Sequence, residues 1–243
     1  ENQAGSTSVT NNTFYITSSP DYNPYFSMAY SGTSVTTPQI VEGNAFHIDH
    51  SGSGYAEAIT FDTAVLNAWN GITTDTGHYT DILIKNNTIY TEGPFARGVG
   101  LVDLSSADGF GTISEAEITG NQIIGENLTD DQTFGITLRG DIEGTLIQNN
   151  SISDLKLGIW YRVGANSVCP SGTDLDKNQL VDLGTAIQND CTATADASPT
   201  WWGSAAGPDP ATIIGPVDYI PWCTNPECTA FYGPVHNVTQ DTY

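Results

Sequence analysis

The chain has 243 residues, which is enough for one large domain or two small ones. Its 28 acidic and 6 basic residues give a formal net charge of −22, which excludes nucleic acid and anionic lipid as partners bound through a basic surface. No run of about eighteen apolar residues occurs, so no membrane span is predicted.

An asparagine recurs in short apolar segments, from SVTNNTFYI near the N-terminus to DLDKNQLVD in the last third of the chain. The intervals between copies are 32, 43, 34, 29 and 28 residues. The residue three positions before each asparagine and the residue two positions after it are always apolar. The aligned asparagines are Asn12, Asn44, Asn87, Asn121, Asn150 and Asn178.

A second column lies between these segments, in EAITFD, VGLVDL, FGITLR, LGIWYR and TAIQND. It aligns Ile59, Leu101, Ile136, Ile159 and Ile187, each preceded by Gly or Ala. Only 23 residues separate Ile136 from Ile159, which leaves no room for a helix in each repeat. The pattern predicts an all-β solenoid in which each strand pairs in parallel with its copies in adjacent windings.

In such a stack, the aligned asparagines are expected to face inward and to form a hydrogen-bonded ladder. We also expect them to adopt the left-handed backbone of a sharp bend, which asparagine tolerates. A leucine-rich repeat is the alternative, because residues 82–89 fit its I-x-I-x-x-N-x-I core. The irregular intervals and the lack of helical segments favour the solenoid.

Two motifs follow the repeats: PTWWGSAAGPDP at 199–210 and VDYIPWC at 217–223. Together they resemble the closing segment of right-handed parallel β-helix repeat proteins, a pectate-lyase-like group of surface and exported proteins. The matching residues are Trp201, Trp202, Gly203, Gly207, Pro208, Val217, Asp218, Tyr219, Pro221 and Trp222.

The resemblance implies a right-handed parallel β-helix of about six to seven windings over residues 1–203. Residues 204–243 would form a Pro-rich C-terminal tail or cap. The two tryptophans are expected to pack against the last winding rather than to form a sugar platform. The group includes polysaccharide lyases and hydrolases, adhesins and structural proteins, so the resemblance leaves the function open.

Four cysteines lie in the C-terminal third. Two disulfides are expected, most simply Cys169–Cys191 and Cys223–Cys228, although four cysteines allow three pairings. A zinc site is the rival interpretation, but paired C-x2-C spacing and matched histidines are lacking.

Five N-glycosylation sequons begin at Asn11, Asn86, Asn127, Asn149 and Asn237. The chain starts at Glu1, and its only methionine is Met28, so either a signal peptide has been removed or the chain is an excised fragment. With the cysteines, these features predict an exported, extracellular or cell-surface protein.

Three positions after the second-column residue, the aligned residues are Asp62, Leu104, Arg139, Arg162 and Asp190. In one interpretation the two arginines clamp the anion of a uronate or a sulfated glycan. In the other they belong to a solvated ladder whose charge is offset by acids such as Asp190. No pair of carboxylates lies between the arginines, which favours the second.

The stretch HIDH places His47 and Asp49 on one side of a strand, followed by His50. This arrangement suits a metal or acid–base role, but two ligands are too few for a metal site. The acidic loop 126–132 contains carboxylates of the kind that bind Ca²⁺, without a D-x-D-x-D-G register. No catalytic motif occurs, so the sequence indicates no catalytic residue and no metal site, without excluding an enzyme. Ca²⁺ is the one cofactor that it leaves open.

A parallel solenoid has unpaired N–H and C=O groups at both ends, and natural solenoids cover them. Here the repeats begin by about Thr7, with only ENQAGS before them. The tail residues Phe231, Val235 and Val238 are expected to anchor an extended strand on a neighbouring copy. We therefore predict a self-assembling structural protein, a subunit of a surface filament, sheath or surface layer.

Two alternatives stay open. Residues upstream of Glu1 would have supplied an ordinary cap, or the chain is a glycan-binding or polysaccharide-cleaving domain that uses the face of Arg139 and Arg162.

Overall fold

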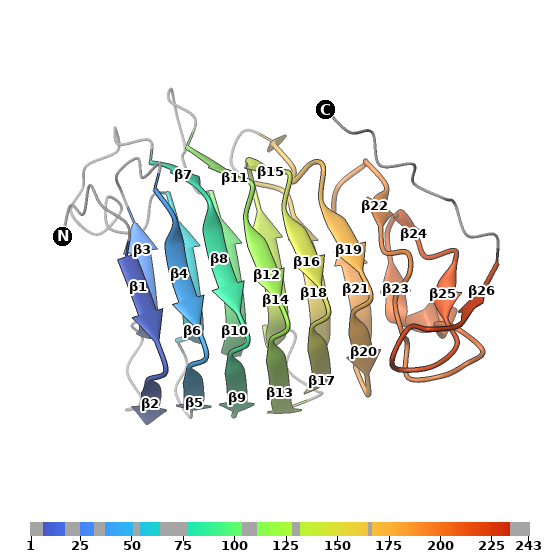
Figure 1. Cartoon of the computed structure of the whole chain (residues 1–243), viewed down its shortest axis with the longest axis horizontal. Helices are drawn as coiled ribbons and strands as arrows, with labels where there is room; N and C mark the ends of the chain where they lie inside the picture. Colours follow the sequence, from blue (N-terminus) through green and yellow to red (C-terminus); the bar gives the residue numbers. More distant parts are fainter. Residues whose placement is uncertain are drawn as a thin grey trace.

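The computed structural model describes residues 7–17, 25–31, 37–50, 54–63, 77–103, 111–127, 132–164 and 167–233. Within these ranges the chain is all-β and contains no α-helix, in agreement with the solenoid rather than the leucine-rich repeat. The strands form stacked parallel sheets, as in a β-solenoid (Figure 1). None of the described segments is a helix long and apolar enough to cross a membrane.

Four parallel sheets make up the stack. Sheet A consists of β1 (Thr7–Thr10), β4 (Gln39–Glu42), β8 (Ile82–Lys85), β12 (Glu117–Thr119), β16 (Leu146–Gln148), β19 (Asp174–Asp176), β22 (Ala195–Asp196) and β24 (Val217–Asp218). Sheet B consists of β2 (Thr13–Thr17), β5 (Ala45–Asp49), β9 (Thr88–Glu92), β13 (Gln122–Asn127), β17 (Ser151–Leu155) and β20 (Gln179–Val181).

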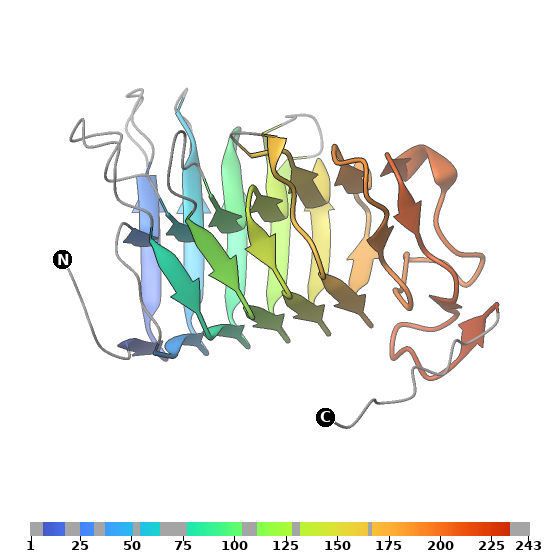
Figure 2. The same cartoon turned by 90° about the horizontal axis from the view of Figure 1, so that it is seen from above.

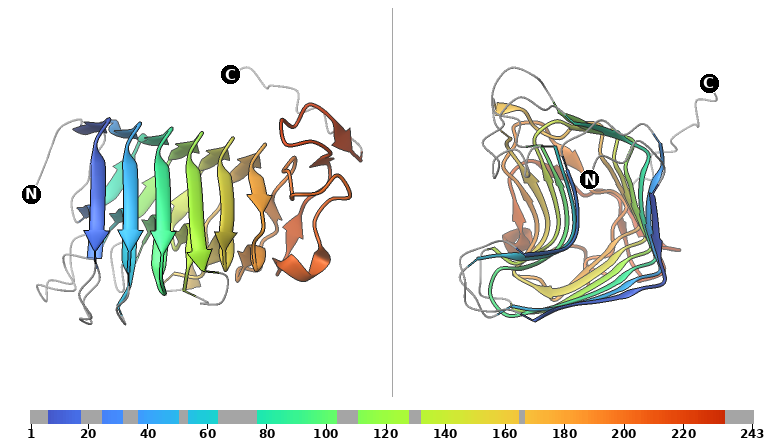
Figure 3. Two further views of the ribbon diagram at one scale, coloured as in Figure 1. Left: turned by 90° about the horizontal axis from the view of Figure 1, so that it is seen from below. Right: turned by 90° about the vertical axis from the view of Figure 1, so that its left-hand side faces the viewer.

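Sheet C consists of β3 (Tyr25–Ser31), β6 (Ala56–Asp62), β10 (Ala96–Val102), β14 (Phe134–Arg139), β18 (Leu157–Arg162), β21 (Thr185–Asn189) and β23 (Ile213–Ile214). The small sheet D consists of β7 (His78–Thr80), β11 (Thr112–Ser114) and β15 (Ile142–Glu143). The chain passes through sheets A, B and C repeatedly in that order, so strands from successive repeats superpose when viewed along the stack (Figure 3, right).

The core contains the two apolar columns that flank the asparagines, as the sequence predicts. On sheet A, Val9, Val41, Ile84, Ile118, Ile147 and Leu175 are consecutive partners. On sheet B, Phe14, Phe46, Ile89, Ile123, Ile152 and Leu180 are consecutive partners. From the second repeat onward these side chains are at most 3% exposed, so their apolar surface is removed from water.

The predicted asparagine ladder is confirmed. Each Nδ2 donates to Oδ1 of the next asparagine, from Asn12 through to Asn178, at 2.9–3.3 Å. The same Oδ1 accepts the backbone N–H of the preceding asparagine, as from Asn87 to Asn121 at 2.9 Å. Asn44 and the later members are at most 2% exposed, so their polar atoms depend on these bonds.

The left-handed backbone lies one residue earlier than expected. The residues with positive φ are Asn11, Gly43, Asn86, Gly120, Asn149 and Lys177, with φ between 53° and 66°. Each immediately precedes a ladder asparagine, which itself has no positive φ. In the pair Asn86–Asn87, the first asparagine makes the corner and the second joins the ladder.

The C-terminal segment covers one end of the stack (Figures 1 and 2, red). Trp202 is 8% exposed and packs edge-on against Tyr219, as expected for end packing. Thr200, beside Asn178 in the next layer, is fully buried where a further ladder asparagine would stand. After the 3₁₀ turn η2 (Pro210–Thr212), strands β23 and β24 still pair with sheets C and A, so the sheets continue past residue 203.

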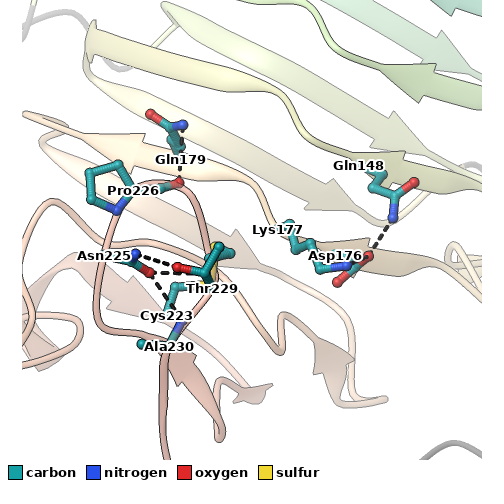
Figure 4. Close-up of a disulfide and its surroundings, with 10 residues drawn as sticks. Gln148, Asp176, Lys177, Gln179, Cys223, Asn225, Pro226, Thr229 and Ala230 are labelled. Carbon is teal, nitrogen blue, oxygen red and sulfur yellow. Dashed lines mark hydrogen bonds and ion pairs between the residues drawn. A yellow bond between two sulfur atoms is a disulfide. The ribbon is translucent and has the colours of Figure 1, made fainter.

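Both expected disulfides are present, Cys169–Cys191 and Cys223–Cys228. The second lies at the antiparallel pair β25 (Trp222–Cys223) and β26 (Phe231–Tyr232). In the loop between these strands, Oδ1 of Asn225 accepts the backbone N–H groups of Thr229 and Ala230 (Figure 4). Nε2 of Gln179 donates to the carbonyl of Pro226 at 3.2 Å, which ties the loop to β20.

Candidate functional site

A cavity of about 200 Å³ lies on the outer face of sheet C, over β6, β10, β14 and β18. Along β6, Ile59 and Phe61 enter the core while Thr60 and Asp62 line the cavity, as alternation across a strand requires. The alternation is broken before Ile59, because Ala58 and Ile59 both belong to the core while Glu57 also lines the cavity. All three arginines of the chain contribute to this cavity. Its lining is Tyr55, Glu57, Thr60, Asp62, Arg97, Val102, Gln132, Phe134, Thr137, Arg139 and Arg162.

Arg139 and Arg162 are direct partners on β14 and β18, as the sequence predicts. Between Asp62 and Arg139, however, the column contains Val102. The expected Leu104 is therefore wrong for this column, and it lies outside the described residues.

The cause is a two-residue shift in the alignment of β10. Val99, not Leu101, pairs with both Ile59 and Ile136. A shift of two residues keeps every side chain on the same face of the strand, so hydrophobicity alone does not distinguish the two registers.

Arg97 lies between two aromatic rings. Its guanidinium carbon is 4.1 Å from the ring centroid of Tyr55 and 5.0 Å from that of Phe134. Its Nε and one terminal nitrogen donate to the carbonyl and the side-chain oxygen of Gln132, each at 3.1 Å. These contacts fix Arg97 at one side of the cavity. Its position was not predicted, because it lies in a Gly-rich stretch outside the aligned columns.

Arg139 and Arg162 form no ion pair within the described part of the chain, whereas Lys85 pairs with Glu117 and Lys177 with Asp176. The Arg162 guanidinium stacks over the ring of Trp160 at 4.0 Å. Nε of Arg139 is buried, and no described residue accepts a hydrogen bond from it.

Nearby carboxylates offset part of the charge of the arginine pair. The charges of Asp190 and Glu57 favour the protonated Arg162 guanidinium, and Asp190 also accepts hydrogen bonds from the Trp160 indole and from Gln188. Burial, together with the charges of Arg139 and Arg97, lowers the pKa of the Arg162 guanidinium to about 10. Cations thus crowd one another in a chain that is otherwise strongly acidic.

Glu57 is a buried carboxyl in the same cavity. It is 3% exposed, and no described residue hydrogen-bonds to its Oε1. That oxygen occupies the space over Gly100 on the next strand, where a Cβ atom would lie 2.2 Å from it. Burial raises the pKa of the Glu57 carboxyl from 4.5 to about 7, although the charge of Arg97, the Thr60 side chain and the charge of Arg162 act to lower it.

The cavity therefore combines three guanidinium groups with a carboxyl that can hold a proton near neutral pH and with the nearly buried Asp62. Guanidinium groups recognise oxyanions by paired hydrogen bonds. A signal for Glu57 was present in the sequence, since a charged residue in the apolar strand AEAITFD is unusual unless it has a role.

The residues of the HIDH stretch lie in two different environments. The ring of His47 stacks between those of Tyr15 and Tyr90, with centroids 4.9 and 5.1 Å away. His47 and Asp49 both line a second cavity of about 290 Å³ on sheet B, together with Glu92 and Glu126. His50 is instead fully buried, and its Nε2 lies 2.9 Å from the carbonyl oxygen of Gly54.

Among the described residues, no three His, Cys, Asp or Glu side chains are grouped closely enough to hold a metal ion. Most of the loop considered for Ca²⁺, residues 128–131, lies outside the described ranges.

Three sequon asparagines, Asn11, Asn86 and Asn149, are exposed at left-handed corners in one row along the stack. Asn237 and the side chain of Asn127 lie outside the description. Glycosylation stays a prediction, because the NN(T/S) pattern also has a structural explanation: its first asparagine adopts the left-handed corner and its second forms the ladder hydrogen bond.

No protein-family model, curated protein or solved structure matches this chain.

Proposed function

We propose that the chain is the subunit of an extracellular structural assembly, a filament, sheath or surface layer, built by head-to-tail contact of solenoids. Each subunit would be a right-handed parallel β-helix of six to seven windings. The proposal is supported by the different character of the two ends of the stack.

Among the described residues, the N-terminal end of the core is incompletely covered. Strands β1, β2 and β3 are terminal in sheets A, B and C, and no described strand pairs with their outer edges. Val9 and Phe14 are only partly buried, whereas their partners Val41 and Phe46 are 0% exposed. Asn12 is exposed, and its Oδ1 accepts no ladder bond from any described residue.

The C-terminal end is closed but carries apolar side chains on its surface. Ile214, Ile220, Phe231 and Tyr232 are 44%, 42%, 37% and 58% exposed. They account for four of the seven large hydrophobic side chains exposed among the described residues. The expected anchors Val235 and Val238 lie outside the described ranges.

Two different apolar surfaces at opposite ends form a heterologous contact, which propagates into a filament unless the rotation closes a ring. The net charge of −22 opposes such contacts through repulsion, which salt screens. The two disulfides agree with an oxidising, extracellular location.

The test is light scattering with electron microscopy over a range of protein and salt concentrations. The wild-type chain should form elongated particles that grow with concentration. A double variant Phe231→Asp/Tyr232→Asp should remain monomeric. The matched control Tyr90→Asp/Val163→Asp, which alters exposed apolar residues away from both ends, should assemble like the wild type. Wild-type protein that stays monomeric at high concentration and moderate salt refutes the proposal.

A further inference from the structure

The cavity on sheet C has no place in the assembly proposal, which concerns the two ends of the stack. Three observations distinguish it from an ordinary polar surface.

The first observation is the concentration of positive charge. The chain has six Lys and Arg residues, and three of them, Arg97, Arg139 and Arg162, line one cavity of about 200 Å³. Arg139 and Arg162 are direct partners on adjacent strands, so the strand spacing of about 4.8 Å holds them near one another. Like charges at this distance repel unless an anion lies between them.

The second observation is that a buried donor lacks a partner. Within the described part of the chain, Nε of Arg139 donates to nothing, and neither Arg139 nor Arg162 pairs with a carboxylate. Buried polar groups in proteins are nearly always hydrogen-bonded, so an orphaned guanidinium donor indicates a missing acceptor.

The third observation is the buried carboxyl beside these cations. Glu57 is only 3% exposed, and no described residue hydrogen-bonds to its Oε1. Its position is built into the fold, since Gly100 leaves the space that the carboxyl occupies. As a neutral acid, Glu57 would donate a hydrogen bond to an oxyanion rather than repel it.

We propose that this cavity is a binding site for the oxyanion group of a small ligand, held by Arg139 and Arg162 beside the buried Glu57 carboxyl. Carboxylate, sulfate and phosphate groups share the required geometry. The small volume admits a small molecule or one acidic unit of a longer one, since pockets for drug-sized ligands are usually larger. The ring of Trp160, under Arg162, keeps the guanidinium plane fixed.

The groups that face Glu57 set the pH dependence of binding. Arg97 and Arg162 favour its ionised form, Asp62 and Tyr55 line the same cavity, and burial favours the neutral form. An anion that binds beside Glu57 adds a further preference for the neutral form. Binding should therefore take up a proton, and affinity should rise as pH falls from 8 to 6.

The test is calorimetric titration of the full chain with glucuronate, inorganic sulfate and inorganic phosphate, with glucose as the uncharged comparison. At least one anion should bind, whereas glucose should give no binding heat. A difference between the binding heats in two buffers of different ionisation enthalpy should reveal proton uptake. Stronger binding of glucuronate would identify an acidic sugar as the ligand class, and stronger binding of sulfate or phosphate would identify an ester or the free ion.

The double variant Arg139→Gln/Arg162→Gln should weaken binding by about tenfold or more, as expected for lost hydrogen bonds to charged groups. The control Lys85→Gln removes a cation outside the cavity and should change affinity less than about twofold. In Glu57→Gln, binding should persist without the pH dependence. Failure of every anion to bind the wild-type chain overturns the proposal, as does equal loss of affinity in the Lys85 control.

Discussion

Nδ2 of Asn87 donates to Oδ1 of Asn121 at 2.9 Å, although 34 residues separate the two in the chain. Asn121 repeats the arrangement with Asn150 at 3.0 Å. Every amide in the interior of this ladder is thus both donor and acceptor, and its removal leaves buried partners on both sides.

Asn121→Ala should therefore destabilise the fold strongly. The substitution leaves the side-chain amide of Asn87 without its acceptor on Asn121. It also leaves the carbonyl of Ile84 without the donor Nδ2 of Asn121, which lies 2.8 Å away. Each stranded buried group costs about 1–3 kcal/mol, so a loss of about 3–5 kcal/mol in the free energy of unfolding is expected in urea denaturation.

The matched control is Asn86→Gly, at an exposed corner where Gly43 and Gly120 already stand at the same position of the adjacent repeats. Since glycine tolerates positive φ, the change should stay within about 0.5 kcal/mol. Comparable losses in the two variants would mean that the ladder contributes no more than the corner does.

Stability should depend on pH through Glu57. Its carboxyl holds a proton more tightly in the folded state, where the pKa is about 7, than at the ordinary value of 4.5. Between these pH values the folded state binds more protons than the unfolded chain, so the free energy of unfolding should fall as pH rises from 4.5 to 7. The full effect is about 3 kcal/mol as an upper limit.

Urea denaturation of Glu57→Gln across this pH range provides the check. The neutral amide has no proton to lose, so the variant should show a flatter profile and should be the more stable protein above pH 7. Parallel profiles for the two proteins would show that Glu57 is ionised in the folded state, contrary to our account.

Gly100→Ala should act mainly through Glu57, because the added Cβ would lie 2.2 Å from Oε1 of that side chain. Overpacking of this kind costs about 1–3 kcal/mol. In a Glu57→Ala background the steric conflict disappears, so the same change should cost much less. A double-mutant cycle measured by thermal denaturation tests this, and additive effects would contradict the contact.

The two disulfides should differ in their contribution to stability. Cys169 and Cys191 are 22 residues apart, whereas Cys223 and Cys228 are 5 apart. Closure of the longer loop restricts the unfolded chain more, by about 3 against about 2 kcal/mol in the loop-entropy model. Thermal denaturation of the paired Cys→Ala variants should follow that order, and the reverse order would argue against an unfolded-state origin.

Much of the fold was predictable because stacked parallel sheets impose the same constraints on every sequence repeat. Asn87 has the same neighbours as Asn121 and Asn150, so a sequence column reveals the ladder. The two asparagines of Asn86–Asn87 were not separated into corner and ladder, since both roles favour asparagine. The register of β10 was missed because Val99 and Leu101 are equally suited to the core.

The candidate site was only partly predictable. Arg139 and Arg162 stand in one column, but Arg97 and Glu57 come from another column and from strands 40 residues apart in sequence. These residues meet because the two columns lie side by side on the same face of sheet C. The periodicity of the sequence does not reveal which columns are neighbours.

In the proposed assembly, strands stacked in parallel continue from one subunit into the next. Fibre diffraction from aligned assemblies tests it most directly. The account predicts a reflection near 4.8 Å along the long axis of the particles, since strands would lie across that axis in every subunit. The same reflection perpendicular to the axis, or a solution containing only single chains, would contradict it.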